Sequence, residues 1–288
     1  MSTAPGPAKR WVLAARPRTL PAAAVPVAIG AASVEPHGVN WLNTGLCLMI
    51  ALALQIGTNY ANDYSDGIRG TDAQRVGPFR LTVSKLVPAK RVRDAAFTCF
   101  AVAGLLGLTL AARTSWWLVL VGASAILAGW LYTGGPKPYG YFGFGELFVF
   151  AYFGLVATVG TAFSQHRTIP AHSWWLAVAT GAMACALLEA NNLRDVEGDR
   201  ASKKKTLAAR LGRTRGSILY SGCVAGVVVG LVVATQFVAA AIALVLYAPA
   251  LRMVYSPKRG RELLPLLQYS ARAQLLLGAL IAFVVARA

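Results

Sequence analysis

Acidic residues are scarce in this sequence. Its 288 residues include 11 Asp and Glu against 28 Lys and Arg, which gives a net charge of +17 at pH 7. Charged residues of both signs make up 14% of the chain, whereas soluble domains usually contain about a quarter. This deficit excludes an ordinary soluble domain.

Cysteine and histidine are also few, and they are scattered. The four cysteines stand singly within apolar runs and form no CxxC pair, which is typical of packing residues (Cys47, Cys99, Cys185 and Cys223). The three histidines lie in short segments far from any acidic cluster (His37, His166 and His172). The sequence therefore indicates neither a disulfide framework nor a histidine metal site.

Long apolar runs dominate what is present. Hydrophobic residues make up 56% of the chain, and the mean hydropathy is +0.54. Nine runs come close to the length of about 20 residues that a membrane-spanning helix needs. The long run Ile218–Leu251 exceeds one span, so we divide it near Gln236. The predicted spans are Thr19–Val34, Trp41–Thr58, Asp94–Ala112, Ser115–Tyr132, Phe142–Phe163, Ser173–Leu193, Gly216–Ala234, Phe237–Tyr255 and Leu263–Ala286.

This pattern predicts an all-α polytopic membrane protein with nine transmembrane helices. Residues 1–288 would form one transmembrane domain, in which 1–18 is a cytoplasmic tail. We expect two four-helix units plus a ninth helix around a central cavity, because spans two and six each end in an acidic cluster followed by a basic loop.

The basic residues lie almost entirely on one side of the predicted membrane. In the nine-span arrangement, 24 of the 28 Lys and Arg residues fall in the N-terminal tail and in alternate loops. Such asymmetry marks the cytoplasmic side, so the N-terminus and both acidic clusters would be cytoplasmic. It also accounts for the positive charge through the lipid bilayer, and we expect no nucleic-acid partner.

Two acidic clusters hold six of the eleven acids: Asp63, Asp66, Asp72, Asp195, Glu197 and Asp199. Residues four apart share a helix face, so Asn62 aligns with Asp66, Asn59 with Asp63, and Asn191 with Asp195 and Asp199. Carboxylate and amide oxygens in this pattern suit Mg²⁺. Glu197 is predicted to point away as a solvated acid.

Basic side chains are interleaved with these acids. They would repel a bare cation, yet they suit a phosphate that the metals bridge, so the pattern favours a diphosphate held by two Mg²⁺ ions. Two alternatives remain. One is a solvated rim of charge, and the other is a cation-coupled transporter, although transporters usually place their acids near the bilayer midplane.

The chain resembles the UbiA superfamily of intramembrane prenyltransferases over nearly its whole length. The likeness rests on NDYSDGIRGTD at Asn62–Asp72 with VGPFR at Val76–Arg80, YTGGPKP at Tyr132–Pro138 with GFGE at Gly143–Glu146, and NNLRDVEGDR at Asn191–Arg200 with KTLAARLG at Lys205–Gly212. Asp72 follows Asn62 by ten residues, a spacing that resembles the branch that acts on 1,4-dihydroxy-2-naphthoate in menaquinone synthesis.

The resemblance implies an enzyme of the bacterial plasma membrane that transfers a polyprenyl group from polyprenyl diphosphate to this naphthoate, with loss of CO₂. It implies metal ligands at Asn62, Asp63, Asp66, Asp72, Asp195 and Asp199, with Asn191 or Asn192 assisting. We predict phosphate contacts from Arg80, Lys137, Arg194 and Lys205, with Lys137 taking part in catalysis beside Asp66, Asp195 and Asp199. Tyr132 and Tyr139 are candidates for contact with the prenyl cation. Another aromatic acceptor, such as 4-hydroxybenzoate, remains an alternative.

Overall fold

The computed structural model describes residues 5–35, 37–71 and 79–287, and all regular structure within these ranges is helical. The α-helices are α1 (Pro7–Ala14), α2 (Pro21–Ala32), α3 (Trp41–Ile68), α4 (Ala89–Arg113), α5 (Trp117–Leu131), α6 (Gly145–Val149), α7 (Gly160–His166), α8 (Ala171–Ala201), α9 (Leu207–Val233), α10 (Phe237–Val254) and α11 (Leu264–Val285). Short 3₁₀ segments lie at η1 (Pro17–Thr19), η2 (Tyr139–Phe142) and η4 (Gly260–Leu263), and a π-helix, η3 (Phe150–Val159), joins α6 to α7.

Seven helical segments within the described ranges are long and apolar enough to cross a membrane. Two shorter apolar helices, α2 and α5, accompany them. The all-helical fold class is confirmed, whereas the predicted count of nine spans is not. The predicted boundary near Gln236 is correct, because α9 ends at Val233 and α10 begins at Phe237.

Local signals in the sequence set the ends of the two longest helices. Asn40 caps α3 by accepting a hydrogen bond from the Asn43 backbone at 3.0 Å. Gly70, at φ +71°, ends α3, since an L side chain is strained in that conformation. Pro170 precedes α8, as suits a residue that cannot donate a backbone hydrogen bond. At their C-terminal ends, both helices extend more than two turns past the apolar stretches predicted from the sequence, to Ile68 and to Ala201.

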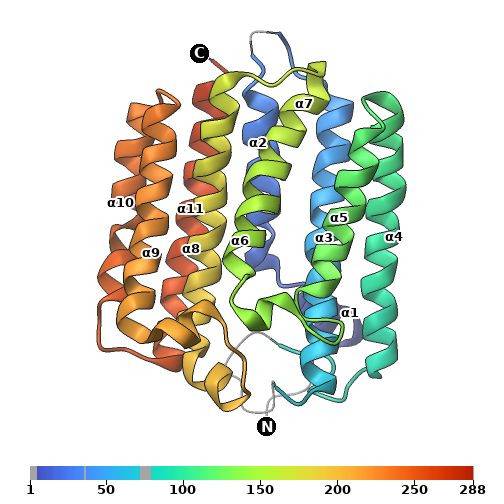
Figure 1. Cartoon of the computed structure of the whole chain (residues 1–288), viewed down its shortest axis with the longest axis vertical. Helices are drawn as coiled ribbons and strands as arrows, with labels where there is room; N and C mark the ends of the chain where they lie inside the picture. The colour runs from blue at the N-terminus through green and yellow to red at the C-terminus, as the bar shows by residue number, and fades with distance from the viewer. Residues whose placement is uncertain (1–4, 36, 72–78, 288) are drawn as a thin grey trace.

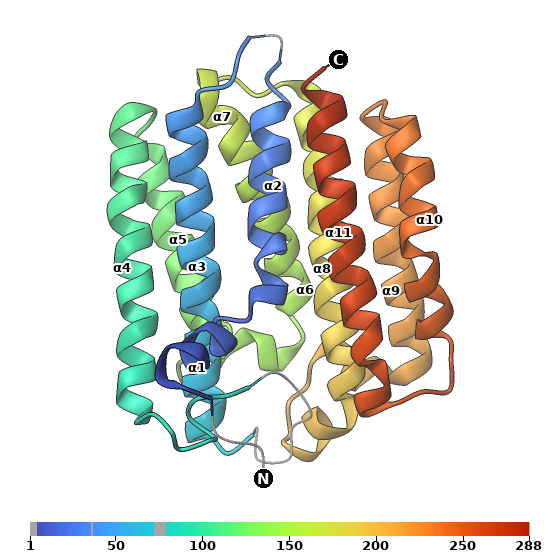
Figure 2. The same ribbon diagram turned by 180° about the vertical axis from the view of Figure 1, so that it is seen from behind.

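The helices stand side by side in one bundle (Figure 1). Helix α3 packs along α4, and α8 packs along α9, while α11 contacts both α2 and α10. The N-termini of α3, α5 and α8 lie together at the top of Figure 1, and α1 lies at the opposite end beside the C-terminal end of α3 (Figure 2). The acidic ends of α3 and α8 therefore lie at the same end of the bundle.

The two sides of the bundle are filled differently. The largest cluster of buried apolar side chains joins α2 to α8, α9, α10 and α11, and includes Tyr220 and Tyr247. A smaller cluster around Tyr60 and Phe100 joins α1, α3 and α4. The space between α2, α3, α5, η3 and α8 holds the cavity, and no described residue of α9, α10 or α11 lines it. The predicted cavity is therefore present, but it lies to one side of a solid half of the bundle.

Glycine allows the π-helix to lie directly against its neighbours. A Cβ atom at Gly154 would lie 2.6 Å from the Cα of Gly181 on α8, and one at Gly30 would lie 2.3 Å from the Thr158 carbonyl oxygen. Only glycine permits backbones to approach so closely. These contacts fix the wall from which Tyr152 and Phe153 face the cavity.

Candidate active site

The cavity has a volume of about 340 Å³, within the range of ligand sites. Polar and charged side chains line one part of it, and the rest is apolar. The charged residues that line it are Arg16, Asp66, Arg80, Asp195, Asp199 and Lys204. The ends of α3 and α8 thus face one chamber, as the sequence predicted.

The first acidic motif lies on the last three turns of α3, and its acids face two different environments. Asn62 and Asp66, one turn apart, line the cavity. The oxygen of Asn62 accepts a hydrogen bond from the Thr133 hydroxyl at 2.7 Å. Asp63 faces the loop that leads to α4, where its two oxygens accept the backbone N–H groups of Leu81 at 2.7 Å and Thr82 at 2.9 Å.

Asp66 lies at the centre of a charged network. Its carboxylate accepts a hydrogen bond from the Arg80 guanidinium at 3.1 Å and one from the Lys204 ammonium at 2.9 Å. The Tyr141 hydroxyl also donates to it. Asp66, Arg80 and Lys204 are all buried, so each charge depends on its partners for the stabilisation that water would otherwise give.

Tyr141 connects this network to η2, the segment between α5 and α6. The Lys204 ammonium lies 4.7 Å from the centre of its ring, and the Arg69 guanidinium lies 5.5 Å away, both within range of a cation–π contact. Burial, and then the negative charge of Asp66, raise the pKa of Tyr141 well above its usual value. The phenol therefore stays protonated at neutral pH and remains a donor to Asp66.

The second motif lies on the last turns of α8. Asn191, Asp195 and Asp199 line the cavity, as their spacing on a helix predicts, and Asn192 lines it as well. Arg194 binds Asp195 through two hydrogen bonds of 2.7 Å, the strong paired geometry of guanidinium and carboxylate. Asp199 accepts a hydrogen bond of 3.0 Å from Thr206, which also caps α9.

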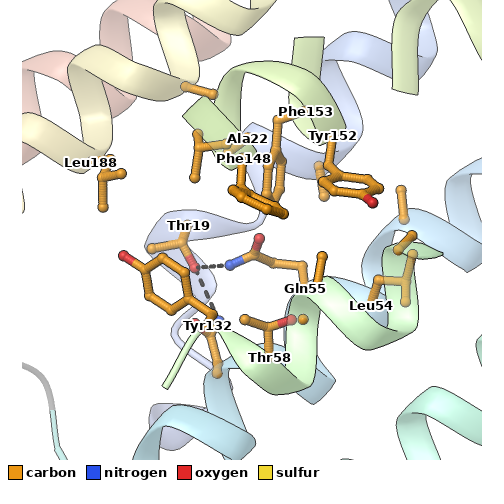
Figure 3. Close-up of a pocket in the computed structure, with 18 of the residues that line it drawn as sticks. Thr19, Ala22, Leu54, Gln55, Thr58, Tyr132, Phe148, Tyr152, Phe153 and Leu188 are labelled. Atoms are coloured by element: carbon orange, nitrogen blue, oxygen red, sulfur yellow. Dashed lines mark hydrogen bonds between the residues drawn. The ribbon is translucent and has the colours of Figure 1, made fainter. Parts of the chain in front are cut away.

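A polar corner between α1 and α2 forms another part of the wall. Gln55 and Asn59, one turn apart on α3, each donate to the Thr19 hydroxyl at 3.1 Å, and Figure 3 shows the bond from Gln55. Asn59 also donates to the Ala15 carbonyl at 2.9 Å. These bonds hold the corner at Arg16, which has φ +54° and lines the cavity.

Aromatic side chains from α6, from η3 and from the residue that follows α5 surround the rest of the chamber. Tyr132, Phe148, Tyr152 and Phe153 gather around its interior (Figure 3). The rings of Phe148 and Tyr139 are stacked with centres 4.0 Å apart. The cavity can therefore hold an anionic group at the end with the acids and cations, and an apolar or aromatic group beyond it.

The donor set suits a hard cation with an anionic ligand. Within the described ranges, no three acidic, histidine or cysteine side chains lie close enough together to hold a metal ion by themselves. Mg²⁺ usually binds through one or two carboxylates plus water and substrate phosphates. The oxygens of the two motifs fit that mode, and the neighbouring Arg80 and Lys204 fit a phosphate.

A comparison with models of known protein families identifies the family of this chain. The model of the UbiA prenyltransferase family matches residues 23–285. The chain belongs to the UbiA prenyltransferase family.

Relatives of this UbiA chain match it over nearly its whole length. The 1,4-dihydroxy-2-naphthoate octaprenyltransferase of Mycobacterium tuberculosis is 49% identical over 271 residues, covering 92% of this chain and 93% of the relative. The enzyme of the same name from Mycobacterium leprae is 46% identical and covers 90% of each. A UbiA homologue from Archaeoglobus fulgidus, solved with GPP and Mg²⁺, shares the fold at a TM-score of 0.68 and 15% identity, covering 97% of this chain and 100% of that one.

Most of the predicted site residues of this UbiA chain line the cavity. They are Asn62, Asp66, Arg80, Tyr132, Tyr139, Asn191, Asn192, Asp195 and Asp199. Asp72 lies outside the described residues. Glu197 is exposed, as predicted.

Four predicted residues have other surroundings. Asp63 anchors a loop with both carboxylate oxygens and does not line the cavity, so its metal-ligand role stays a prediction. Lys137 and Lys205 are exposed and do not line the cavity. Arg194 is buried against Asp195 and does not line the cavity.

Lys204 was missed because three lysines stand in a row. The local backbone distinguishes them: Lys203 takes φ +59°, a left-handed turn after α8 that directs the following residue inward. Lys204 is buried, whereas Lys203 and Lys205 are exposed. Thr19, Gln55 and Tyr141 were missed as well, since each lies outside both acidic motifs and gave no signal in the sequence.

Proposed function

We propose that this protein transfers a polyprenyl group from polyprenyl diphosphate to 1,4-dihydroxy-2-naphthoate, releasing CO₂ and diphosphate and giving demethylmenaquinol. One observation supports this most directly. A single chamber combines two acidic motifs, buried cations and an aromatic interior, in a chain whose near full-length relatives have names for this transfer.

We propose that the cofactor is a divalent metal, bound as two Mg²⁺ ions. Asp66 would hold one, and Asp195 with Asp199 the other, with the oxygen of Asn191 beside the second pair. When bound, the metal supplies positive charge that stabilises the departing diphosphate. Asn62 fits a contact to substrate better than to metal, because its oxygen already accepts the Thr133 hydrogen bond.

The chain's own cations would bind the diphosphate. Lys204 and Arg80 both lie against Asp66 and line the cavity, so a phosphate oxygen entering beside Asp66 meets both. As the allylic C–O bond breaks, its electron pair goes to the diphosphate, where these donors stabilise the growing charge. Arg194 contributes by orienting Asp195.

The apolar interior would protect and direct the allylic cation. Tyr132, Phe148 and Tyr152 exclude water, which would otherwise capture the cation, and their ring faces attract positive charge. A new C–C bond forms at the ring carbon that bears the carboxylate. The bond to that carboxyl carbon then breaks, CO₂ leaves, and its electron pair restores the aromatic ring.

We propose that the chain forms one domain that crosses the bacterial plasma membrane nine times. The two short helices α2 and α5 would cross it together with the seven longer segments. Five exposed tryptophans mark the outer interface: Trp41, Trp116, Trp117, Trp174 and Trp175. Asn62 follows Trp41 by 21 residues, and Asp195 follows Trp174 by 21 residues. At about 1.5 Å per residue, both intervals match a hydrocarbon core of about 30 Å. This supports acidic motifs at the cytoplasmic surface, where soluble diphosphate can leave.

A product assay tests this function. Purified protein in detergent micelles, with Mg²⁺ and a polyprenyl diphosphate, is offered dihydroxynaphthoate or 4-hydroxybenzoate in separate reactions. We expect prenylated naphthol and CO₂ from the first acceptor and little product from the second. Turnover of 4-hydroxybenzoate alone would overturn the acceptor assignment, and no prenyl transfer to either would overturn the proposed function.

A further inference from the structure

Glu146 lies immediately behind the second acidic motif, and the proposed chemistry gives it no task. It stands in the first turn of α6, after the left-handed Gly143. One carboxylate oxygen of Glu146 accepts a hydrogen bond of 2.9 Å from the side-chain nitrogen of Asn192. Asn192 lines the cavity, whereas Glu146 does not, so this hydrogen bond links Glu146 to the site.

The hydrogen bond determines which end of the amide faces the cavity. An asparagine side chain has one donor end, the NH₂ group, and one acceptor end, the carbonyl oxygen, whereas an ionised carboxylate only accepts. Because the NH₂ group of Asn192 is bonded to Glu146, the carbonyl oxygen is the end available to a ligand in the cavity. An amide oxygen suits a hard cation, whereas an NH₂ group would repel it.

The amides nearest the proposed metal-binding acids differ between the two motifs. On α8, Asn191 also has its NH₂ group engaged, by the Leu187 carbonyl oxygen at 3.3 Å. On α3, Asn62 has the opposite end engaged, since its oxygen accepts from Thr133. The amides beside Asp195 and Asp199 therefore direct their oxygens to the chamber, as do Gln55 and Asn59 at the Thr19 corner, whose NH₂ groups are also engaged, whereas the amide one turn before Asp66 does not.

We propose that Glu146 is a positioning residue that fixes the Asn192 carbonyl oxygen as a ligand for the divalent cation of the second motif. The proposal rests on the function proposed above, and it adds a cation ligand and the residue that orients it. Groups that orient a metal ligand from behind typically contribute about 10- to 100-fold in metal affinity. We expect that contribution from Glu146.

A double-mutant cycle between positions 146 and 192 tests this inference. Glu146→Gln keeps the size but introduces an amide that donates as readily as it accepts, so Asn192 can turn its NH₂ group toward the cavity. Asn192→Asp places two carboxylates against each other in a buried site. The double variant exchanges the two groups, so that the amide donates to the new carboxylate and an oxygen again faces the cavity without a change in net charge.

The readout is the dissociation constant of Mn²⁺, measured by electron paramagnetic resonance in the presence of inorganic diphosphate, on the full chain in micelles. We expect each single variant to bind Mn²⁺ roughly 10- to 100-fold more weakly, and the double variant to recover most of that loss. The thermal midpoint of each variant is measured in parallel. As a control, Glu146→Gln is combined with Asn191→Asp. The new carboxylate then stands on Asn191, which is bonded to Leu187 and not to position 146, so Mn²⁺ affinity should not recover.

Several results would overturn the inference. If Glu146→Gln lowers the thermal midpoint while Mn²⁺ affinity stays at the wild-type value, Glu146 has only a structural role. If the effects of the two substitutions on Mn²⁺ affinity are additive, Glu146 does not orient Asn192 through their hydrogen bond. If wild-type protein binds Mn²⁺ and prenylates dihydroxynaphthoate while the cycle shows no coupling, the positioning role fails and the proposed function stands. Failure of the wild type in both assays would instead reject the proposed function.

Discussion

Lys204 and Asp66 form an ion pair of 2.9 Å between buried side chains that are 138 residues apart in the sequence. Asp66 belongs to the motif at the end of α3, and Lys204 to the loop that follows the motif on α8. This contact joins the two halves of the site. It also places a cation beside the carboxylate proposed to hold the metal, where a diphosphate oxygen can meet both.

Replacing Lys204 should weaken the use of polyprenyl diphosphate. Lys204→Met removes a charge-assisted contact worth about 1.5–3 kcal/mol, so we expect kcat/KM for the prenyl donor to fall by about 10- to 100-fold. Initial rates over a range of prenyl diphosphate concentrations measure this.

Lys205→Met is the matched control, because the neighbouring lysine is exposed and does not line the cavity. It should keep kcat/KM near the wild-type value. Equal losses in the two variants would contradict the distinction between the two lysines.

Asp63 should matter for stability more than for metal binding. Asp63→Asn places an NH₂ group against one of the backbone N–H groups of Leu81 and Thr82, which then loses its acceptor. A buried donor left unpaired costs about 1–3 kcal/mol, so the thermal midpoint in micelles should fall. Mn²⁺ affinity should stay close to wild type.

Asp94→Asn serves as the comparison, since Asp94 forms only an exposed pair with Arg93, and such pairs contribute little. Its thermal midpoint should not change. A loss of Mn²⁺ binding in Asp63→Asn at unchanged stability would instead support the predicted role of Asp63 as a metal ligand.

The contact between Gly154 and Gly181 should be intolerant of any side chain. Gly154→Ala would place a Cβ atom 2.6 Å from a backbone atom of α8, which forces η3 and α8 apart and should lower the thermal midpoint. In Gly222→Ala, on α9, the new Cβ meets nothing within 4 Å, and alanine favours helix. The thermal midpoint of this control should match or exceed that of the wild type. Equal thermal midpoints for the two variants would show that the close contact is absent.

Lys203 occupies a backbone conformation that favours glycine. At φ +59°, a non-glycine residue pays about 1–2 kcal/mol, so Lys203→Gly should keep or raise the thermal midpoint and preserve activity. Lys203→Ala removes the same charge but retains the strain. If the alanine variant is the more stable of the two, the left-handed turn does not constrain this loop.

The sequence allowed the fold class, the main helices and both acidic motifs to be predicted, because each depends on local patterns. Apolar runs determine helices in a bilayer, and a four-residue spacing places Asn191, Asp195 and Asp199 on one face. What could not be predicted depends on contacts between distant segments. Whether Asp63 or Asp66 faces the chamber is decided by the loop at Leu81, and which lysine of three enters is decided by the turn at Lys203.

The position of the cavity to one side of the bundle also could not be predicted from the sequence. The two helix units look alike as patterns of hydropathy, yet large side chains such as Tyr220 and Tyr247 fill the half formed by α8 to α11. Hydropathy does not show how side chains from different helices interlock. The same holds for the Thr19, Gln55 and Asn59 corner, whose three residues come from two separate segments.

The central claim is that both acidic motifs act together in prenyl transfer to dihydroxynaphthoate, and one measurement tests it most directly. Turnover of dihydroxynaphthoate by Asp66→Asn and Asp195→Asn is compared with that of Glu197→Gln, which alters an exposed acid on the same helix as Asp195. We predict no detectable turnover in the first two variants, with helical content retained by circular dichroism, and wild-type turnover in the third. Wild-type turnover in either Asp66→Asn or Asp195→Asn would contradict the account.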